Sequence, residues 1–462
     1  MNLLFLLSIV VAFICGSLLT GCFWPTRPRP ALLLAVMALP AGLVLTSASF
    51  FFWTVISGGR SNWYPVVEVI LLFLAMAVVW FRQHKGDRAW WPVLRWRLPI
   101  THVSVLSGLL LLICASLCFV ITCKLADVNP WGYWDAWARI NHKARFLFAG
   151  GDNWTWVFHT VAVAHPDYPL LLPCTVARIW SWGGEIDLRG PQLLSVIWGV
   201  WSLVVLYSMV SWLRSSLTAA ILGLAYLTYQ PLLFWSAAQY ADLPLVCLML
   251  LAWGMLTAVR QFPDHARNFA CLAGFFAGSA AWCKNEGIVF LLLIFIWWVL
   301  CFLKMRIFDR NKTILCFFFG LTIPVGALLV LKTVYAGKTD IIADNSFAPQ
   351  SIFALVADGE RHRIIFESIG HLFDSSWSGG PLILVAAAFL LQHLCSCQRI
   401  AHVGTIVSVA AMIAVYYLVF LTTPHDLHWH LGTAIDRLIL QLWPVFLLGL
   451  AVMFEEVPPE VV

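Results

Sequence analysis

Apolar residues run in long stretches along the whole chain, separated by short segments that carry most of the charged residues. The stretches cover roughly residues 3–22, 31–56, 64–81, 103–121, 193–213, 217–235, 243–259, 269–282, 288–303, 314–334, 382–394, 406–421 and 438–453. Several have the ~18 or more residues that a helix needs to cross about 30 Å of hydrocarbon. Because a backbone exposed to lipid must pair its own polar groups, we expect these stretches to be helices. The pattern predicts an all-α polytopic membrane protein with about 13 transmembrane helices.

The composition supports this class and excludes others. The 462 residues are 61% hydrophobic and 11% charged, whereas a soluble domain carries about 25% charged residues. The 13 cysteines lie mostly inside apolar stretches, and the nearest pair, Cys395 and Cys397, lacks the C-x-x-C spacing of a redox or zinc site. We therefore assign no disulfide. The net charge of +5 is spread over several loops, so it indicates no nucleic-acid partner.

Basic residues mark one side of the membrane. The segment 82–97 holds five bases against the single acid Asp87, so the positive-inside rule makes it cytoplasmic. The next apolar stretch crosses back and puts the loop 124–169 outside. As the stretches alternate, the later bases also fall on the cytoplasmic side: Arg214, Arg260, Arg267, Lys304, Arg306, Arg310, Lys312 and Arg399. Three further segments face the outside, at 239–242, 336–381 and 425–437.

The chain reads as one membrane domain with two sizeable outer loops. The segment 168–182, YPLLLPCTVARIWSW, is apolar but short and rich in proline, so we expect a helix on the outer membrane surface. The parts are N-terminal transmembrane helices with a basic cytoplasmic loop (1–122), an extracytoplasmic candidate catalytic loop with surface helices (123–189), transmembrane helices (190–335), an extracytoplasmic loop (336–381), and C-terminal transmembrane helices with a short cytoplasmic tail (382–462).

Ionisable groups gather at the outer ends of the predicted helices. They begin in WDAWARINHKARFL and return from distant segments: Asp135, Arg139, His142, Lys143, His165, Asp167, Asp242, Lys284, Glu286, His425, Asp426, His428, His430, Asp436 and Arg437. Because an ionisable group near lipid is costly, several at one face indicate a cleft between helices and water. Many such groups are also ordinary interfacial anchors. That alternative explains Lys284, Asn285 and Glu286 less well. These residues lie between two short apolar stretches, and two of them carry opposite charges.

Acids and fixed bases that face the outer leaflet suit a reaction on a lipid-linked anion. A base such as Lys284 or Arg437 pairs strongly with a phosphate, and a carboxylate such as Asp135 takes a proton from an attacking hydroxyl or amine. The sequence has no Walker A motif, so it indicates no ATP coupling. HDLHWH (425–430) has the residue types of a metal site, but also those of a surface anchor beside tryptophan.

Five segments carry a family resemblance, in matching order and on the matching predicted side: WDAWARINHKARFLFAGGDNW, HPDYPLLLP, YADLPLVCLMLLAW, AGSAAWCKNEGIVFLL and DRLILQLWP. They resemble the GT-C membrane glycosyltransferases, in the branch of the protein O-mannosyltransferases and lipid A aminoarabinose transferases. The resemblance covers roughly residues 129–450. It implies the GT-C fold, a catalytic region in the first extracytoplasmic loop and a polyprenyl-phosphate-linked sugar as donor.

The resemblance also implies roles for particular residues. The catalytic acid corresponds to Asp135 and the phosphate-binding lysine to Lys284, with Arg437 near the donor phosphate. The other residues expected to bind substrate are His165, Asp167, Tyr168, Asp242, Asn285 and Glu286. Ala136 stands where many members have glutamate. Asp167, in place of the second proline of a His-Pro-Pro segment, is our candidate for the missing carboxylate.

The predicted function is transfer of a hexose or pentose from a polyprenyl-phosphate carrier to an extracytoplasmic acceptor: a protein, a lipid or a cell-envelope glycan. The transfer inverts the anomeric carbon if it is one direct displacement, because no second nucleophile is evident. A divalent cation, Mg²⁺ or Mn²⁺, held by Asp135, Asp167 or Asp242 stays open, and no other cofactor is indicated. We expect a bacterial inner-membrane protein, surrounded by membrane lipid, whose active site faces outside.

Two other classes of function stay open. A transporter or flippase for polyprenyl-linked sugars needs polar groups near the bilayer midplane and at both faces, whereas here they concentrate at the outer edge. A non-catalytic protein of the same fold binds the lipid-linked sugar without releasing the carrier. Release of the carrier therefore distinguishes an enzyme from a binding protein.

Overall fold

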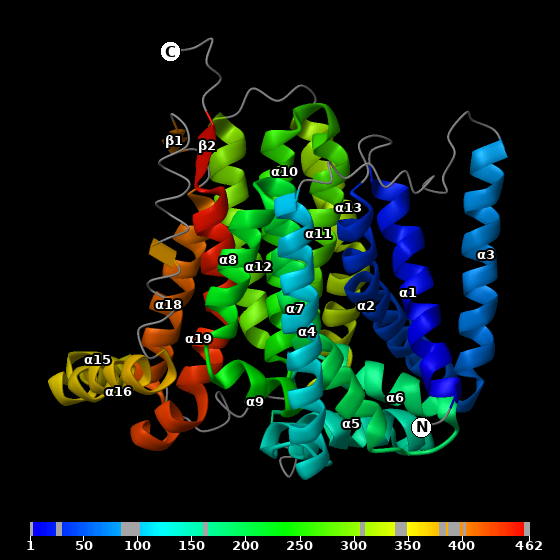
Figure 1. The fold of residues 1–462 in the computed structure, drawn as a ribbon. Helices are drawn as coiled ribbons and strands as arrows, with labels where there is room; N and C mark the ends of the chain where they lie inside the picture. The colour runs from blue at the N-terminus through cyan, green and yellow to red at the C-terminus, as the bar shows by residue number, and fades with distance from the viewer. Residues whose placement is uncertain are drawn as a thin grey trace.

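The structure is a computed structural model that describes residues 3–24, 30–84, 102–159, 165–304, 310–337, 349–377, 385–386, 398–400 and 403–456. Helices account for most of the described residues and stand side by side in a bundle (Figure 1). Two short strands, β1 (Gln398–Ile400) and β2 (Phe454–Glu456), pair in antiparallel orientation. The prediction of an all-α membrane protein is confirmed, apart from this small ribbon.

Apolar helices of different lengths occupy the predicted spans. Their bounds are α1 Leu3–Phe23, α2 Ala31–Ser57, α3 Tyr64–His84, α4 His102–Val128, α7 Arg189–Leu213, α8 Ser216–Leu227, α9 Pro231–Ala237, α10 Asp242–Gln261, α11 Ala266–Cys283, α12 Asn285–Lys304, α13 Arg310–Val330, α18 Gly404–Thr422 and α19 Leu427–Val452. Among the described residues, nine helices are long and apolar enough to cross a membrane, or ten if α8 and α9, bent by 78°, form one span. Every predicted stretch has a helix at its place except 382–394, most of which lies outside the described residues.

Shorter elements gather at one end of the bundle, which we call the site end. It is the end at which α10 begins with Asp242 and α11 finishes with Cys283, and α5, α6 and α9 lie there in Figure 1. The short helices are α5 Asn141–Ala149, α6 Leu171–Gly183, α15 Pro349–Ala357 and α16 Gly359–Trp377. The single turns there are η1 Ser61–Trp63, η2 Ala136–Ile140, η3 Gly151–Asn153, η4 Trp156–Phe158 and η6 Leu331–Tyr335, of which η2 and η6 are π-helical. One further turn, η5 Pro263–His265, joins α10 to α11 at the opposite end.

The chain direction places basic residues at the far end of the bundle. α10 starts at the site end and its 20 residues rise about 30 Å. Its last turn therefore carries Arg260 to the opposite end, where Arg267 begins the return along α11. β2, which follows α19, lies at that opposite end as well (Figure 1). These bases and the site end are thus separated by about one membrane thickness, in agreement with the predicted alternation.

α10 lies at the centre of the core. Every residue from Asp242 to Val259 is buried, and α10 packs against α7, α11 and α19. α11 and α13 approach closely because glycines face the opposite backbone: a Cβ on Gly274 would lie 2.0 Å from the carbonyl oxygen of Phe317. Small residues permit such contacts between membrane helices. The side chains at the ends of α10 and α11 are therefore positioned by closely packed elements.

α6 differs from the surface helix that the sequence predicts. It is short and does not span, as predicted, but every residue from Leu171 to Trp182 is buried. Arg178, in its middle, donates from Nε to Oε1 of Glu68 on α3 at 2.8 Å and from Nη2 to the carbonyl oxygen of Ser8 on α1 at 2.7 Å. The expected membrane-surface position is therefore wrong, because these polar contacts bind α6 to α1 and α3 inside the protein.

Candidate functional site

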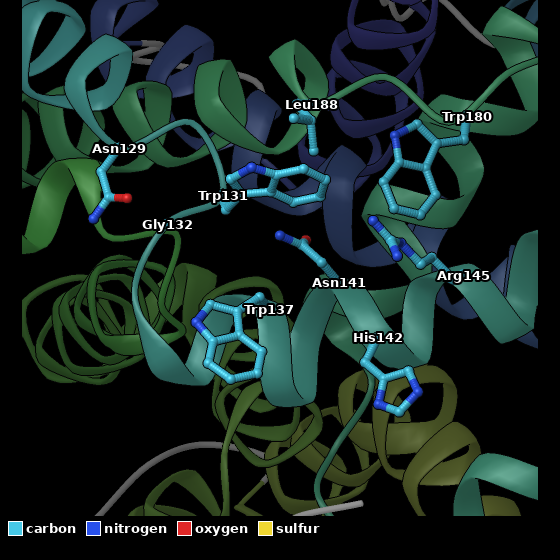
Figure 2. Close-up of a pocket in the computed structure, with 9 residues that line it drawn as sticks. All are labelled: Asn129, Trp131, Gly132, Trp137, Asn141, His142, Arg145, Trp180 and Leu188. Carbon is cyan, nitrogen blue, oxygen red and sulfur yellow. The ribbon is translucent and has the colours of Figure 1, made fainter.

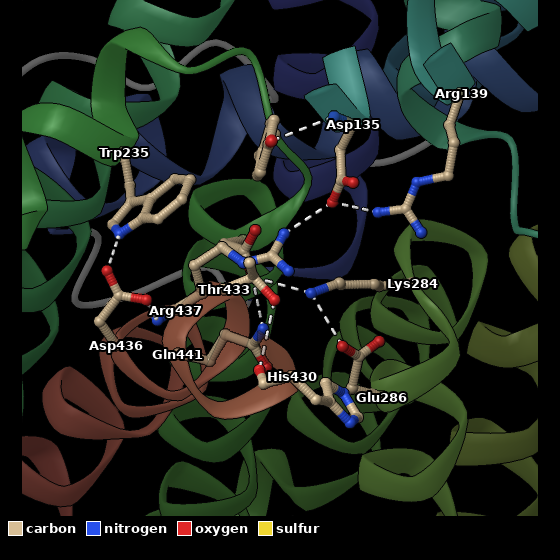
Figure 3. A network of polar contacts seen from close by, with 12 residues as sticks. Asp135, Arg139, Trp235, Lys284, Glu286, His430, Thr433, Asp436, Arg437 and Gln441 are labelled. Carbon is tan, nitrogen blue, oxygen red and sulfur yellow. Dashed lines mark hydrogen bonds and ion pairs between the residues drawn. The ribbon is translucent and has the colours of Figure 1, made fainter. Parts of the chain in front are cut away.

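Asp135 precedes η2 and is held by residues from distant segments (Figure 3). Its Oδ2 lies 2.6 Å from Nη1 of Arg437 on α19 and also pairs with Arg139, one helical turn later. Its backbone N–H donates to Oη of Tyr240 at 3.0 Å. The side chain of Asp135 is 13% exposed, and its Oδ1 has no hydrogen bond to any residue that the structure describes. One carboxylate oxygen is thus fixed, and the other is available to a ligand.

A second group of ion pairs surrounds Lys284, between α11 and α12. Its Nζ lies 2.8 Å from Oδ1 of Asp242 and 2.8 Å from Oε1 of Glu286. Gln441 of α19 donates from Nε2 to the same Oδ1 at 2.5 Å. Burial by itself would lower the pKa of Lys284, but the two carboxylates outweigh it and raise the pKa above its ordinary value. Lys284 is therefore a buried cation between two acids.

A third group joins Asp167 to Lys332 of η6. Nζ of Lys332 lies 2.7 Å from Oδ2 of Asp167 and donates to Oδ1 of Asn285 at 3.2 Å. The side chain of Lys332 is 26% exposed, against 5% for Lys284. Since Asn285 directly follows Lys284, this group adjoins the second one. Lys332 is consequently the more accessible of the two lysines.

The segment around His165 is held by its backbone. His165 has a positive φ of 51°, an uncommon conformation for a residue with a side chain. Lys143 of α5 is buried and donates to the carbonyl oxygens of His165 at 2.7 Å and Pro166 at 3.3 Å. Tyr168 is half-buried, with the Arg139 guanidinium 4.8 Å from its ring centroid. Burial raises the pKa of Tyr168 well above its ordinary value, so its hydroxyl stays protonated.

Two residues of α19 connect the first two groups. Arg437 and Gln441 are four positions apart, so they share one face of the helix. Arg437 reaches Asp135 while Gln441 reaches Asp242. Figure 3 shows Arg437 and Gln441 close to Lys284. Of the residues selected from the sequence, ion pairs and hydrogen bonds thus join Asp135, Asp167, Asp242, Lys284, Asn285, Glu286 and Arg437. His165 is held to Lys143 through its carbonyl oxygen, His142 lines a separate cavity, and Asp426 caps α19. In the ion pairs of this cluster four acids, Asp135, Asp167, Asp242 and Glu286, oppose four bases, Arg139, Lys284, Lys332 and Arg437.

Three members of the cluster were not selected from the sequence. Lys332 lies inside the apolar stretch 314–334. A single charge near the end of a membrane span indicates a functional residue, so the sequence contained a signal for Lys332. Tyr240 and Gln441 are uncharged residues in or beside apolar helices, and nothing in the sequence separates them from ordinary packing residues. Their contacts with Asp135 and Asp242 depend on the tertiary structure.

The carboxylates do not form a metal-binding set. Oxygens of Asp135, Asp167 and Asp242 each face a lysine or arginine. Within the described parts of the chain, no three His, Cys, Asp or Glu residues are arranged to hold a metal ion. In HDLHWH, Asp426 instead accepts a hydrogen bond from the Trp429 backbone at 2.8 Å and caps α19. We therefore assign no step to a metal.

No protein-family model matches the sequence, and no curated protein matches it either. Two solved structures are similar: ArnT from Cupriavidus metallidurans in the apo state, and ArnT from the same organism bound to undecaprenyl phosphate. Each is 14% identical to this chain, with a TM-score of 0.47 over 74% of this chain and 59% of that chain. This chain thus spans about three fifths of the ArnT chain. The fold and the cluster define a polytopic helical membrane protein with an ion-paired polar site at one end of its bundle.

Proposed function

We propose that the chain is a membrane glycosyltransferase of the GT-C type, which transfers a sugar from a polyprenyl-phosphate carrier to an acceptor. One observation carries the proposal: Asp135 lies in one cluster with the cations Arg437 and Lys284, although the three come from distant parts of the chain (Figure 3). The reaction needs a proton acceptor for the nucleophile and positive charge for the departing phosphate. An acid beside fixed cations supplies both.

The reaction is a single displacement at the anomeric carbon. The acceptor oxygen forms a bond to this carbon while the bond from the carbon to the phosphate oxygen breaks. The phosphate leaves with the bonding electrons, and Oδ1 of Asp135 takes the proton from the acceptor hydroxyl. Attack and departure occur on opposite faces of the sugar, so the product has the inverted anomeric configuration.

Arg437 and Lys284 hold the donor phosphate in this proposal, and Lys332 adds a third cation. Each of these cations is already paired with an acid, so a phosphate must displace one. The side chain of Glu286 is 24% exposed, whereas that of Asp242 is 2% exposed. Glu286 is therefore the acid that gives way when the donor enters. The exchange replaces one charge-assisted contact of Lys284 by another.

The sugar contacts the remaining residues of the cluster. We assign this role to His165, Asp167, Tyr168, Asp242, Asn285 and Glu286. Asp167 is fixed by Lys332, and Tyr168 keeps its hydroxyl proton. These groups can accept and donate hydrogen bonds to sugar hydroxyls without a change of protonation state. The sugar is a hexose or a pentose.

We place the site at the outer face of a bacterial inner membrane, with the polyprenyl chain among the membrane lipids. The support is the basic segment 82–97, which the positive-inside rule makes cytoplasmic and which precedes α4. α4 leads from there to the loop with Asp135. The acceptor is then an extracytoplasmic protein, lipid or cell-envelope glycan.

Purified protein incubated with radiolabelled polyprenyl-phosphate sugars, together with a fraction of extracytoplasmic proteins, lipids and glycans as acceptors, tests the proposal. The wild type should release the carrier, and Asp135→Asn should lower this rate by about 10²- to 10⁴-fold. Asp152→Asn is the matched control, because Asp152 is exposed in η3 of the same loop. Full turnover in Asp135→Asn contradicts the role of Asp135. Movement of intact donor across sealed vesicles identifies a transporter, and binding without release identifies a binding protein.

A further inference from the structure

A cavity of about 500 Å³ lies beside η2 and α5 and takes no part in the ion-pair cluster (Figure 2). Its volume is that of a small-molecule site. Three tryptophans and three polar side chains supply most of its functional groups: Trp131, Trp137, Trp180, Asn141, His142 and Arg145. The cavity therefore combines flat aromatic surface with hydrogen-bonding groups.

Asn141 is a buried polar group directed into this cavity. The residue is 6% exposed, and its Nδ2 donates to Oε1 of Gln239 at 2.9 Å. Its Oδ1 accepts no hydrogen bond from any part of the chain that the structure describes. Figure 2 shows the amide pointing toward Trp131 across the cavity. Because buried acceptors in folded proteins are nearly always paired, this oxygen can take a donor from a ligand or from a bound water.

The aromatic groups leave ring surface open to the cavity. Trp131 is 49% exposed and Trp137 is 47% exposed. The indole N–H of Trp180 donates to the carbonyl oxygen of Asp187 at 2.8 Å, so its buried ring serves as a wall. The Arg145 guanidinium lies 5.5 Å from the Trp131 ring centroid. These positions provide apolar faces with polar groups at their edges.

Two backbone positions next to the cavity adopt uncommon conformations. Gly132 has a φ of +71°, and a Cβ there would lie 2.6 Å from Cβ of Ala136 and 2.8 Å from the carbonyl oxygen of Ala238. Gln239 has a φ of 63° although it carries a side chain. Glycine adopts a positive φ without strain, whereas Gln239 is strained by it. Strained residues cluster at functional sites, where the surrounding structure holds them in place. Gln239 is held here by Asn141 and by the carbonyl oxygen of Pro130.

We propose that this cavity binds a pyranose ring of the acceptor, as a subsite separate from the position of the donor sugar. A pyranose has a face of C–H groups that packs on an aromatic ring, and hydroxyls around its rim that donate and accept hydrogen bonds. A hydroxyl donates to Oδ1 of Asn141, while the C–H face lies on Trp131 or Trp137. The cavity holds one permanent charge, Arg145, so it suits a sugar better than a phosphate.

This inference rests on the proposed function and narrows its acceptor to a glycan or glycolipid. Asn141 follows Asp135 by six positions, about 9 Å along a helix, which is a separation that a short oligosaccharide spans. The neighbours Gln239 and Tyr240 bond to Asn141 and to the Asp135 backbone, respectively. A sugar bound in the cavity therefore stands on the same two segments that position Asp135.

The test is saturation-transfer NMR with methyl pyranosides of glucose, galactose, mannose and N-acetylglucosamine. The protein is reconstituted in phosphatidylcholine nanodiscs, because sugar-based detergents would compete. In the wild type we expect saturation transfer, which reports binding, to at least one pyranoside. Asn141→Leu and Trp131→Ala should bind that pyranoside about tenfold more weakly. Trp131→Phe should retain most of the binding because it keeps an aromatic face. Trp156→Ala is the matched control, since Trp156 is equally exposed at 49% but lies outside the cavity lining.

If the wild type shows no saturation transfer to any of the pyranosides, the inference is overturned. An equal loss in Trp156→Ala also overturns it, because the tryptophans would then act as membrane anchors. If Asn141→Leu fails to fold, Trp131→Ala and Trp131→Phe decide, since Trp131 is half-exposed. Asp135→Asn should keep pyranoside binding. If the wild type binds a pyranoside but transfers no sugar from polyprenyl-phosphate carriers, the proposed function is refuted and the cavity remains a sugar site.

Discussion

Arg437 and Asp135 are 302 positions apart, yet their side chains form an ion pair at 2.6 Å. The guanidinium of Arg437 also lies over the rings of Tyr240 and Trp235, 5.0 Å and 5.4 Å from their centroids. A planar guanidinium can stack on rings and donate in a fixed direction at the same time, which an ammonium cannot do. The site therefore depends on the geometry of this arginine as well as on its charge.

Arg437→Lys should lower turnover about 10- to 100-fold although it keeps the positive charge. The lysine loses the ring contacts and no longer directs Oδ2 of Asp135. Carrier release from polyprenyl-phosphate sugars measures the effect. Arg363→Lys is the control, because Arg363 is 58% exposed on α16 and pairs with two nearby glutamates. Wild-type turnover in Arg437→Lys would show that charge alone suffices.

The two lysines of the cluster should respond differently to removal of their charge. Lys332→Met leaves Asp167 without its ion-pair partner near the surface, so we expect a stability loss of about 1–2 kcal/mol and a donor KM raised about tenfold. Lys284→Met leaves Asp242 and Glu286 unpaired beside each other, one of them buried, and should cost about 3–5 kcal/mol. Thermal unfolding and donor titration separate the two effects. Lys312→Met, exposed at the opposite end of α13, should change neither. An unchanged donor KM in Lys332→Met would remove Lys332 from the phosphate site.

The spans were predictable from the sequence because hydrocarbon imposes one simple rule. A run of apolar residues long enough to cross it must be a helix, and the bases at its ends give its direction. α10 follows this rule from Asp242 to Gln261. The acids and bases at the site end were predictable for the same reason, since they stand out against apolar surroundings. Asp135 and Lys284 lie in the same polar cluster, as the gathering of ionisable residues at one predicted face indicated (Figure 3).

The pairings were less predictable because they depend on packing between distant helices. Glu68 and Arg178 lie in apolar segments 110 positions apart, and the sequence does not say that they meet. α6 looked like a surface helix because an apolar segment has the same pattern whether lipid or protein covers it. Gln441 is another example, since its role appears only when α19 lies against Asp242. The sequence therefore indicated the chemistry of the cluster better than its contacts.

Tyr240 should make stability depend on alkaline pH. Burial raises its pKa to about 12, from an ordinary value of 10.0. The unfolded chain loses the phenolic proton near pH 10 and the folded chain only near pH 12, so folding favours the protonated form. Its contribution is full below pH 10 and is lost as the pH rises to about 12, by at most ~1.4 kcal/mol per pH unit.

Melting temperatures of the wild type and Tyr240→Phe between pH 8 and 12 measure this contribution. The wild type should lose stability more steeply above pH 10 than the variant, because phenylalanine has no proton to release. Comparison of the two proteins removes the contribution of the other tyrosines. Parallel pH profiles would show that Tyr240 does not contribute.

The ion pair between Glu68 and Arg178 should be essential for stability. Both side chains are buried, with 3% and 0% exposed, and Glu68 also accepts from the indole N–H of Trp182 at 2.8 Å. Glu68→Ala leaves a buried guanidinium without its carboxylate, which should cost about 3–5 kcal/mol. Glu367→Ala, which removes an exposed glutamate of α16, should cost less than about 1 kcal/mol.

Removal of both charges distinguishes a buried ion pair from simple packing. In Glu68→Leu with Arg178→Met, neither charge is left unpaired, and apolar side chains of similar size fill the space. The double variant should therefore be more stable than either single variant, because much of each single loss is the cost of the remaining partner. Thermal unfolding of the four proteins gives the coupling energy directly. Additive losses in the double variant would mean that the two residues stabilise α3 and α6 independently, contrary to the contact at 2.8 Å.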